Sequence, residues 1–581
     1  MSTTVTGIPQ HGEIEGAQPP TPRAEIDRAV EQLAAQKDRW ARLPVRDRRA
    51  ILRELGRDFA RVAEPWAEAC REAEGIPAGT STAAEEWLAG PYFIQRNLAL
   101  LDDALADVER YGRPRIPGPV TTRPDGRVVA QVFPQRIYDR IFYGGVSAEV
   151  WMEPGVAAGE LPATQAVAYH QRDPRGRISL VLGAGNVSSI GPMDALYKLF
   201  VENRVVVYKL HPLNAYLGPL LAEGFQALLD WGVLRLVYGG ADVGSYLCEH
   251  PLVDEIHITG SDKTVEAIVF GPGEEGRLRK AQRKPKNDKP ISAELGNVSP
   301  VIVAPGPWTE ADLAYQAENL AAMLTNNAGF NCNATRVLIT SKGWTKRRGL
   351  LDRLRAELAR IPTRRAYYPG AEERFRTFLE AHPEAERFGR PADGELPWAM
   401  IPDLDPQAEG EICYRTEAFC GLFAETALEA PTVKDFLARA VDFANRRLWG
   451  TLNATILIHP KSLKNPENAE ALDRAIAELR YGTVSINNWA AIGYGLVVPP
   501  WGAYPGHDVY DVQSGIGVVH NTLMFSRVEK TVVRSPWRMS PKPIWFPSHK
   551  TALAMARKLV AFEASPSPWK LPGIILTALR G

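Results

Sequence analysis

The chain has 581 residues, too many for one hydrophobic core, which predicts two large domains with smaller additions. Basic and acidic residues balance at 68 each, so the overall charge gives no reason to expect nucleic acid or an acidic membrane as partner. Five cysteines, none in a Cys-x-x-Cys pair, argue against a zinc site and favour a reducing, cytoplasmic setting.

The N-terminal segment, residues 1–22, is polar and is expected to be a loose arm. It lacks the basic start and the apolar stretch of a signal peptide. No run of about 18 apolar residues occurs anywhere, so no membrane-spanning segment is expected.

Two helices are predicted next. The first should begin at Thr21-Pro22, with Ile26, Val30 and Leu33 on one face. The second should cover residues 48–63, and its arginines are expected to form a solvated face: Arg46, Arg48, Arg49 and Arg53. Residues 100–176 mix turns with strand-like pieces, which we interpret as insertion and arm material. The strand-like pieces are 128–133 and 148–151.

From residue 177 onward, short apolar runs alternate with helical patterns. The runs are ISLVLGAG, RVVVYKL, LRLVYGG and VDEIHITG, and the helices are expected at 193–201, 215–229, 243–249 and 265–270. This alternation is typical of right-handed βαβ units in a parallel sheet, which binds nucleotides beyond the carboxyl ends of its strands. Residues 271–290 are rich in basic side chains and are interpreted as a solvated linker. A second alternation runs from SPVIVA to about residue 488.

One cysteine stands apart. Cys332 lies in the stretch LTNNAGFNCNATR, between a helical pattern and the strand-like run at 337–339. A lone cysteine is more often a small buried hydrophobe than a nucleophile. The amide side chains around it are poor material for a dry core, because each needs several hydrogen-bond partners. We therefore interpret Cys332 as the candidate nucleophile.

A carboxylate precedes this cysteine in the run SAELGNVSP. Glu294 next to a glycine could equally be an exposed loop acid. Together with Cys332, however, it completes the equipment for forming a thioester and hydrolysing it, since a carboxylate can activate water.

In order along the chain, the motifs GAGN, KLHP, ITGS, ELG, NAGFNC, TEAF and WGAYPG…SGIG resemble those of the aldehyde dehydrogenase superfamily. The resemblance covers roughly residues 23–525. It implies an α/β fold with two Rossmann-like parallel-sheet domains and a β oligomerisation arm. The implied cofactor-binding domain is 23–154 plus 177–290, with an insertion at about 100–154. The arm is 155–176 plus 491–535, the catalytic domain 291–490, and 536–581 is a C-terminal extension.

The resemblance also implies roles for individual residues. Cys332 would attack an aldehyde, Asn186 would stabilise the developing oxyanion together with a backbone N–H, and Glu294 would activate water. NAD or NADP would bind through residues that otherwise suit a strand end, a helix cap and a core aromatic: Lys209, Gly260, Ser261, Glu417 and Phe419. The expected reaction is oxidation of a small-molecule aldehyde to a carboxylic acid. Members are usually dimers or tetramers, so a homodimer or homotetramer is expected.

Three positions depart from the usual pattern. Pro212 stands where NAD-preferring members often carry a glutamate that pairs with ribose hydroxyls, so NAD and NADP both remain open. Asn297 and Cys420 replace common glycines.

Two alternatives stay open at this point. One is an acylating enzyme that passes its thioester to coenzyme A, although such relatives usually lack the water-activating glutamate. The other is a non-catalytic scaffold at a membrane surface that uses the C-terminal tail. In that tail, Ser548 is expected to cap a helix with an apolar stripe, which more often packs against protein than against lipid. The stripe is Leu553, Ala556, Leu559 and Val560.

Overall fold

The computed structural model describes residue 16 and residues 18–581, so most of the predicted loose arm at 1–22 lies outside the described residues. Helix α1 (Arg23–Ala41) follows Pro22 and buries the predicted face. Helix α2 (Val45–Ala73) is longer than predicted, because its apolar face continues past residue 63. The prediction that Arg48 faces solvent is wrong. Arg48 is only 1% exposed, and its guanidinium donates to the Trp40 carbonyl and, at 2.6 Å, to Asn203 Oδ1.

Residues 81–152 form the next helices and strands along the chain. They comprise η1 (Ser81–Ala83), α3 (Ala84–Trp87), η2 (Leu88–Tyr92), α4 (Phe93–Tyr111), β1 (Val120–Thr122), β2 (Val128–Phe133), α5 (Ile137–Phe142) and β3 (Ser147–Met152). The two strand-like pieces predicted here are therefore confirmed as β2 and β3. Residues 100–111 are not insertion material, however, because α4 continues through them with a buried apolar face.

The first sheet has six strands in the order β19-β8-β7-β4-β5-β6. Five strands are parallel: β4 (Ile178–Leu182), β5 (Val205–Lys209), β6 (Leu234–Val237), β7 (Glu255–Gly260) and β8 (Ile291–Leu295). Antiparallel β19 (Gly515–Ile516) closes one edge. The helices between the strands are α6 (Ile190–Phe200), α7 (Gly218–Gly224), α8 (Gln226–Asp230), α9 (Ala241–Glu249), α10 (Asp262–Phe270) and α11 (Gly273–Ala281). The predicted α/β fold with a parallel sheet is thus confirmed in this half.

Two local predictions in this half were wrong. The single helix expected at 215–229 is split into η5 (Pro212–Leu217), α7 and α8, with Pro219 in the first turn of α7 and Gly224 at its end. The expected linker at 271–290 contains helix α11, whose first turn carries Glu274 and Glu275. Acidic side chains in the first turn and basic ones in the last turn, here Arg279 and Lys280, both stabilise a helix through its dipole.

The second sheet has eleven strands in the order β1-β2-β3-β21-β17-β16-β9-β10-β15-β14-β12. Its parallel centre consists of β17 (Thr483–Ile486), β16 (Asn453–Leu457), β9 (Pro300–Val303), β10 (Val337–Ser341), β15 (Leu422–Leu428) and β14 (Trp398–Leu404), and β12 (Glu386–Phe388) is antiparallel. The helices on its faces are α12 (Glu310–Thr325), α13 (Arg347–Arg360), α14 (Ala371–Ala381), α16 (Val433–Arg447) and α17 (Pro466–Glu478).

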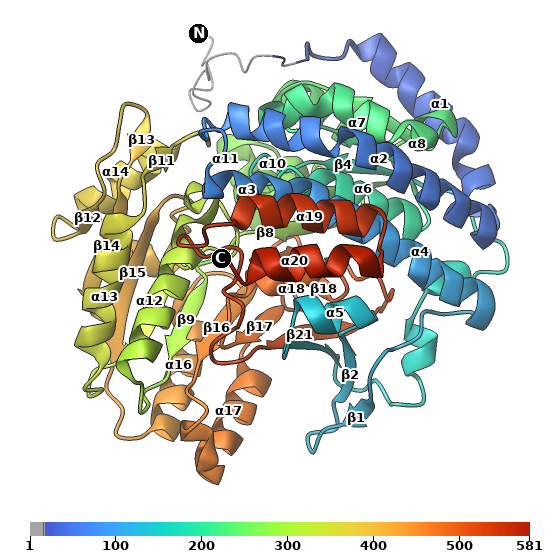
Figure 1. Ribbon diagram of the computed structural model, residues 1–581. Helices are drawn as coiled ribbons and strands as arrows, with labels where there is room; N and C mark the ends of the chain where they lie inside the picture. The colour runs from blue at the N-terminus through green and yellow to red at the C-terminus, as the bar shows by residue number, and fades with distance from the viewer. Residues whose placement is uncertain (1–15, 17) are drawn as a thin grey trace, which may run out of the picture.

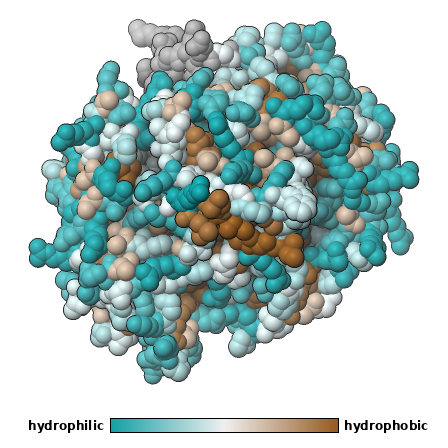
Figure 2. All heavy atoms as spheres, viewed as in Figure 1, coloured by the Kyte–Doolittle hydropathy of each residue, from teal (hydrophilic) through white to brown (hydrophobic). Residues whose placement is uncertain are grey.

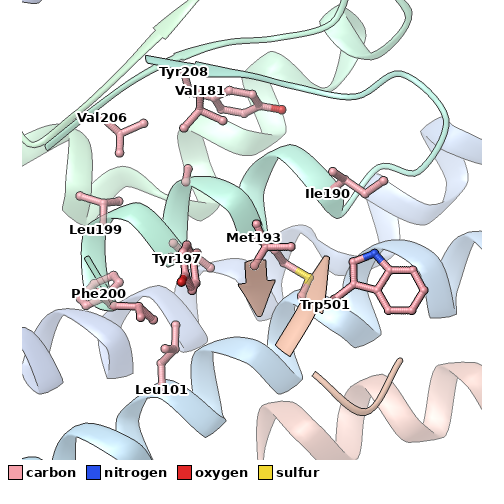
Figure 3. Close-up of a cluster of buried hydrophobic side chains, with 14 of the residues drawn as sticks. Leu101, Val181, Ile190, Met193, Tyr197, Leu199, Phe200, Val206, Tyr208 and Trp501 are labelled. Atoms are coloured by element: carbon pink, nitrogen blue, oxygen red, sulfur yellow. The ribbon is translucent and has the colours of Figure 1, made fainter. Parts of the chain in front are cut away.

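Short elements complete the chain. They are η3 (Leu161–Thr164), η4 (Val167–Tyr169), η6 (Asn326–Gly329), η7 (Ser462–Lys464), β11 (Arg364–Arg365), β13 (Glu395–Leu396), α15 (Ile412–Arg415), α18 (Ala491–Leu496), β18 (Pro500–Gly502) and β20 (Val518–His520). The apolar core around α6 joins the first sheet to α4 and to β18, as Leu101, Met193 and Trp501 show in Figure 3.

One part of the predicted oligomerisation arm holds no strand. Residues 155–176 contain only the 3-10 helices η3 and η4, and no named strand falls in that described segment. The other predicted part, 491–535, contains β18, β19, β20 and β21 (Val528–Arg534), and β21 pairs with β3, which β2 and β1 extend. β21 pairs in parallel with β17 of its own chain, so β21, β3, β2 and β1 extend the second sheet.

The C-terminal extension returns across the molecule and ends in α19 (Ala552–Ala564), η8 (Pro568–Lys570) and α20 (Leu571–Ala578), coloured red in Figure 1. α19 begins after Thr551 rather than at the predicted Ser548, because residues 549–551 form a turn. It packs on α3, η2 and α4, and buries Ala556, Leu559 and Val560. In the described part of the chain, no helix combines the length and apolarity needed to cross a bilayer.

Candidate active site

Cys332 lies in the loop between η6 and β10, as the sequence predicts, and is half-buried. The backbone of Asn327, Ala328 and Gly329 is left-handed there, which turns the chain sharply. The amide side chains hold this turn: Asn327 Nδ2 donates to the Asn186 carbonyl at 2.7 Å, and Asn331 Nδ2 to Asn326 Oδ1 at 2.9 Å. These amides are therefore satisfied within the loop rather than buried without partners.

The Cys332 carbonyl is held by a small polar network that sequence reasoning missed. Ser299 Oγ and Asn453 Nδ2 each donate to it at 3.3 Å. Both groups also donate to Asn297 Oδ1, at 2.8 and 3.2 Å. The departure at Asn297 thus has a structural role, because its amide fixes the two side chains that position the cysteine backbone.

Arg336 connects the cysteine loop to the TEAF loop. Its buried guanidinium donates to the carbonyls of Cys420 at 2.6 Å and Gly329 at 2.7 Å. The sequence did offer one signal for this role. Arg336 directly precedes a strand of buried residues, and a charge in such a place needs several hydrogen-bond acceptors.

Glu294 lies on β8, is buried, and interacts through its carboxyl with the Cys332 thiol. Trp501 Nε1 donates to Glu294 Oε1 at 3.0 Å. Burial is the main reason that the pKa of Glu294 rises to about 8, although the Trp501 hydrogen bond opposes the shift. The SGIG motif fixes the strand: the Leu295 N–H donates to the Ser514 carbonyl at 2.9 Å.

A second carboxyl faces the same thiol. Glu417 is half-buried, packs over Gly296, and has its pKa raised to about 7, mainly by burial of the carboxyl. Its Oε1 atom is buried and has no hydrogen-bond partner among the described residues. Burial, followed by the charges of Glu294 and Glu417, raises the pKa of the Cys332 thiol well above its usual value. The thiol therefore needs a proton acceptor before it can react.

Asn186 reaches the cysteine loop from the turn after β4. Its Nδ2 donates to the Phe330 carbonyl at 2.8 Å, and its own carbonyl accepts from Tyr367 Oη at 3.0 Å. The second Nδ2 hydrogen is available for a ligand. Gly185 is required beside it, because a Cβ there would lie 2.4 Å from His211 Nδ1.

Three of the predicted cofactor residues lie at the carboxyl ends of β5 and β7, the two strands that flank β4 in the first sheet. Lys209 ends β5 and is buried, which lowers its pKa to about 8 despite the nearby Asp242 carboxylate. Gly260 ends β7, and Ser261 caps α10 by accepting from the Thr264 N–H at 3.3 Å. This is the edge at which a parallel α/β sheet binds nucleotides.

Phe419 lies in the second half and has a left-handed backbone, with φ of 41°. It packs edge-on against Tyr368, with ring centroids 4.9 Å apart, and against Phe330 at 6.0 Å. Tyr368 in turn stacks at 6.3 Å on His211, two residues after Lys209. These aromatic contacts connect the TEAF loop to the predicted cofactor edge of the first sheet.

A cavity of about 480 Å³ reaches Cys332 from the surface. Asn186, Asn333 and Trp489 line it near the thiol. Its outer walls come from α3, η2, α4 and α5 and from the C-terminal extension. The arrangement combines a thiol, two acids with raised pKa and an amide donor at the end of a pocket, which suits acyl chemistry on a small molecule.

Comparisons with known proteins agree with this arrangement. The aldehyde dehydrogenase family profile matches residues 147–370. 4-Trimethylaminobutyraldehyde dehydrogenase A of Danio rerio is 30% identical over 174 residues, which cover 30% of this chain and 31% of the relative. The human enzyme of the same type is 30% identical over 205 residues, covering 34% and 36%. The matched segment thus spans about a third of the length of these relatives.

Solved structures show the fold over most of the chain. NADP-dependent glyceraldehyde-3-phosphate dehydrogenase from Bacillus halodurans, complexed with NADP, has a TM-score of 0.58 at 18% identity, covering 89% of this chain and 92% of that one. An indole-3-acetaldehyde dehydrogenase complexed with NAD⁺ has a TM-score of 0.57 at 16% identity, covering 88% and 89%. The chain therefore shares its two-sheet α/β fold with these solved dehydrogenases, and residues 147–370 match the aldehyde dehydrogenase family.

Proposed function

We propose that this protein oxidises an aldehyde to a carboxylic acid, with Cys332 as nucleophile, Glu294 as general base and NAD or NADP as hydride acceptor. The observation that carries the proposal is the contact of the Cys332 thiol with the buried Glu294 carboxyl at the end of a cavity open to a small molecule. The curated relatives named above are aldehyde dehydrogenases, and the two solved structures carry NADP or NAD⁺.

The chain's own residues fit a nicotinamide dinucleotide. The partnerless Glu417 Oε1 is an acceptor suited to a ribose hydroxyl, and Lys209 is a donor at the strand edge. The start of α10, capped by Ser261, offers N–H groups for a pyrophosphate. Phe419 would support the nicotinamide ring. Pro212 begins η5 and supplies no carboxylate against a 2′-phosphate, so both cofactors belong in the test.

The proposed chemistry follows from the contacts around the thiol. The Cys332 thiol gives its proton to the Glu294 carboxylate, and its sulfur adds to the aldehyde carbonyl carbon. The resulting alkoxide would accept hydrogen bonds from Asn186 Nδ2 and the Cys332 N–H. The nicotinamide, when bound, supplies the acceptor for the hydride that leaves this carbon, and a thioester on Cys332 remains. Glu294 then releases the thiol's proton to solvent and takes a proton from water, whose oxygen attacks the thioester; the carbon–sulfur bond breaks, the Cys332 thiolate leaves and the acid is released.

The test is turnover of an aldehyde panel with NAD and with NADP, using Cys332→Ala as the inactive variant. Wild type should yield one acid per reduced nicotinamide, and mass spectrometry of the mixed reaction should find the acyl group on Cys332. Loss of activity in Cys332→Ala should exceed 1000-fold. Activity of this variant within tenfold of wild type, or an acyl group on another side chain, would refute the assignment.

The acylating alternative predicts a different product. If coenzyme A were the acceptor, its thioester would accumulate and turnover would stop without it. The buried Glu294, positioned against the thiol, favours hydrolysis instead. Product analysis with and without coenzyme A separates the two reactions, and a strict requirement for coenzyme A would overturn the hydrolytic one.

A further inference from the structure

The cavity above Cys332 is built largely by the C-terminal extension. Met539, Trp545 and Phe546 come from the segment that precedes α19, Leu559 from α19, and Ile574 from α20. Each of these side chains is buried or half-buried against the rest of the protein. Residues 536–581 therefore form one wall of an apolar channel that leads to the thiol.

The opposite wall is apolar as well. Leu88 and Tyr92 from η2, Phe93 from α4 and Phe142 from α5 line it. Phe142 packs edge-on against Phe562 of α19, with centroids 5.0 Å apart, which holds the two walls together. The volume of about 480 Å³ lies in the range of pockets that enclose a whole small molecule.

Few charged side chains line the channel. Arg364 forms an ion pair with Glu85 at 3.0 Å, and Lys542 Nζ donates to the Ser548 hydroxyl at 2.9 Å. Burial lowers the pKa of His549, which favours its neutral form. A polar tail would lose water there and would meet mostly apolar side chains, with scattered polar atoms such as Trp545 Nε1 and His549 Nδ1, which are buried without a hydrogen-bond partner among the described residues.

The mouth of the channel is apolar too. Ile141 of α5 and Ile575 of α20 line the channel and are still 44% and 42% exposed. Ile137 of α5, Leu576 of α20 and Leu579, which caps the C-terminal end of α20, are 72%, 51% and 67% exposed. Figure 2 shows a hydrophobic area where Figure 1 places α20. Apolar surface therefore continues from the outside inward to the thiol.

We infer that the substrate is a long-chain aliphatic aldehyde, whose tail fills the channel and reaches the α5/α20 mouth while its carbonyl lies at Cys332. This inference rests on the proposed aldehyde oxidation and names its substrate class. Each methylene that leaves water contributes roughly a fourfold gain in binding. Affinity in the transition-state complex should therefore increase with chain length until the tail reaches solvent.

Chain-length dependence is the first test. Propanal, hexanal, decanal and dodecanal are compared as substrates with the full-length protein and the better of NAD and NADP, below their aggregation limits. We expect kcat/KM to rise at least about 100-fold from propanal to dodecanal, which is the gain from burying roughly three to four methylenes. A four-carbon aldehyde with a trimethylammonium group serves as the polar competitor and should be oxidised no faster than hexanal.

A matched pair of variants tests the channel itself. Ile575→Asp places a charge on the lining at the mouth, whereas Leu579→Asp places the same charge on the same helix outside the lining. Both positions are exposed, so both variants should fold with melting temperatures close to wild type. Ile575→Asp should lower kcat/KM for dodecanal at least tenfold and leave propanal within twofold. Leu579→Asp should change neither more than twofold.

The outcomes separate this inference from the function on which it rests. If propanal is oxidised and dodecanal is no better, or the trimethylammonium aldehyde is preferred, the substrate class is wrong and the enzymatic function stands. If Ile575→Asp and Leu579→Asp affect dodecanal equally, the tail does not occupy the channel. If no aldehyde in the series reduces either nicotinamide, the proposed function itself fails.

Discussion

At the scale of single residues, the protonation states of one thiol and two carboxyls determine what the site can do. The Cys332 thiol faces two carboxyls, Glu294 with a pKa of about 8 and Glu417 with a pKa of about 7. Near pH 7 Glu294 is therefore mostly protonated, and only the minority carboxylate form can accept the proton of the thiol or of water. The reaction should accelerate as the pH rises through 8.

The first residue-scale prediction concerns Glu294→Gln. The amide keeps the shape of the carboxyl but cannot take a proton from the thiol or from water, so formation of the thioester and its hydrolysis should both slow. Stopped-flow measurements should show a burst of reduced nicotinamide that is slower than in wild type, followed by a steady rate at least 100-fold below wild type. A steady rate within tenfold of wild type would contradict the role of Glu294 as general base.

A second prediction concerns the hydrogen bond from Trp501. Trp501 Nε1 donates to Glu294 Oε1 and so favours the charged carboxylate. In Trp501→Phe this stabilisation is lost, the pKa of Glu294 rises further, and the alkaline rise of kcat should move to higher pH. The pH–rate profile is the measurement. An unchanged midpoint would show that a different group controls the rise.

A third prediction concerns Asn186→Ala. If one Nδ2 hydrogen stabilises the alkoxide, its loss should lower kcat by about 100- to 1000-fold with little change in KM. Since Nδ2 also donates to the Phe330 carbonyl, the thermal unfolding of the variant must be compared with wild type. A rate loss below fivefold in a normally folded variant would exclude the role.

The sequence pointed to the candidate thiol and acid, which the structure brings together, better than to the residues that position them. Cys332 and Glu294 could be found because a thiol among amides and an acid in a buried-looking run are chemically conspicuous. Asn297 and Arg336 act through hydrogen bonds to residues far away in the sequence, Asn453 and Cys420. Only the folded backbone brings these partners together. No periodicity or motif spacing reports such contacts, so the structure was needed to find them.

At the scale of elements, α19 is fixed to the body of the protein by a buried ion pair. Arg96 of α4 donates to Glu563 Oε1 at 3.0 Å and to Asp139 Oδ1 at 2.9 Å. All three side chains are at most 4% exposed, so each charge depends on the others for compensation. This contact determines where the channel wall stands relative to η2 and α4.

The element-scale prediction follows from this pair. Glu563→Ala leaves the Arg96 charge undercompensated in the interior and should lower the free energy of unfolding by about 3–5 kcal/mol. Arg557→Ala is the matched control, because it removes an exposed pair from the same helix, 3.4 Å from Glu68, and should cost less than about 1 kcal/mol. Denaturant unfolding measures both. Equal effects would show that burial of the pair adds nothing.

Element prediction from the sequence succeeded where apolar periodicity was strong and failed where local and tertiary preferences compete. Strands β4, β5, β6 and β7 follow the predicted order, because runs buried on both faces leave a clear pattern. Helix α11 was missed because its surface is almost entirely charged and only Gly276 is buried. The pairing of β3 with β21 was missed because the two strands lie hundreds of residues apart along the chain.

At the scale of the whole molecule, the second sheet is completed within one chain. β21 joins β17 on one side and β3 on the other, so the edge of the parallel centre is covered internally. Every side chain assigned to the site also comes from this chain. The homodimer or homotetramer expected from the sequence stays a prediction, and it would have to form through other surfaces than this edge.

The last prediction is that catalysis does not require a second subunit. Specific activity per chain should stay constant within about 30% from roughly 10 nM to 10 µM protein, because assembly supplies no residue to the thiol, the acids or the channel. Light scattering on the same samples reports the oligomeric state across that range. If activity falls as the oligomer dissociates, a neighbouring chain is needed to order the site. Strands β1 to β3 would then be the first place to look for that contact.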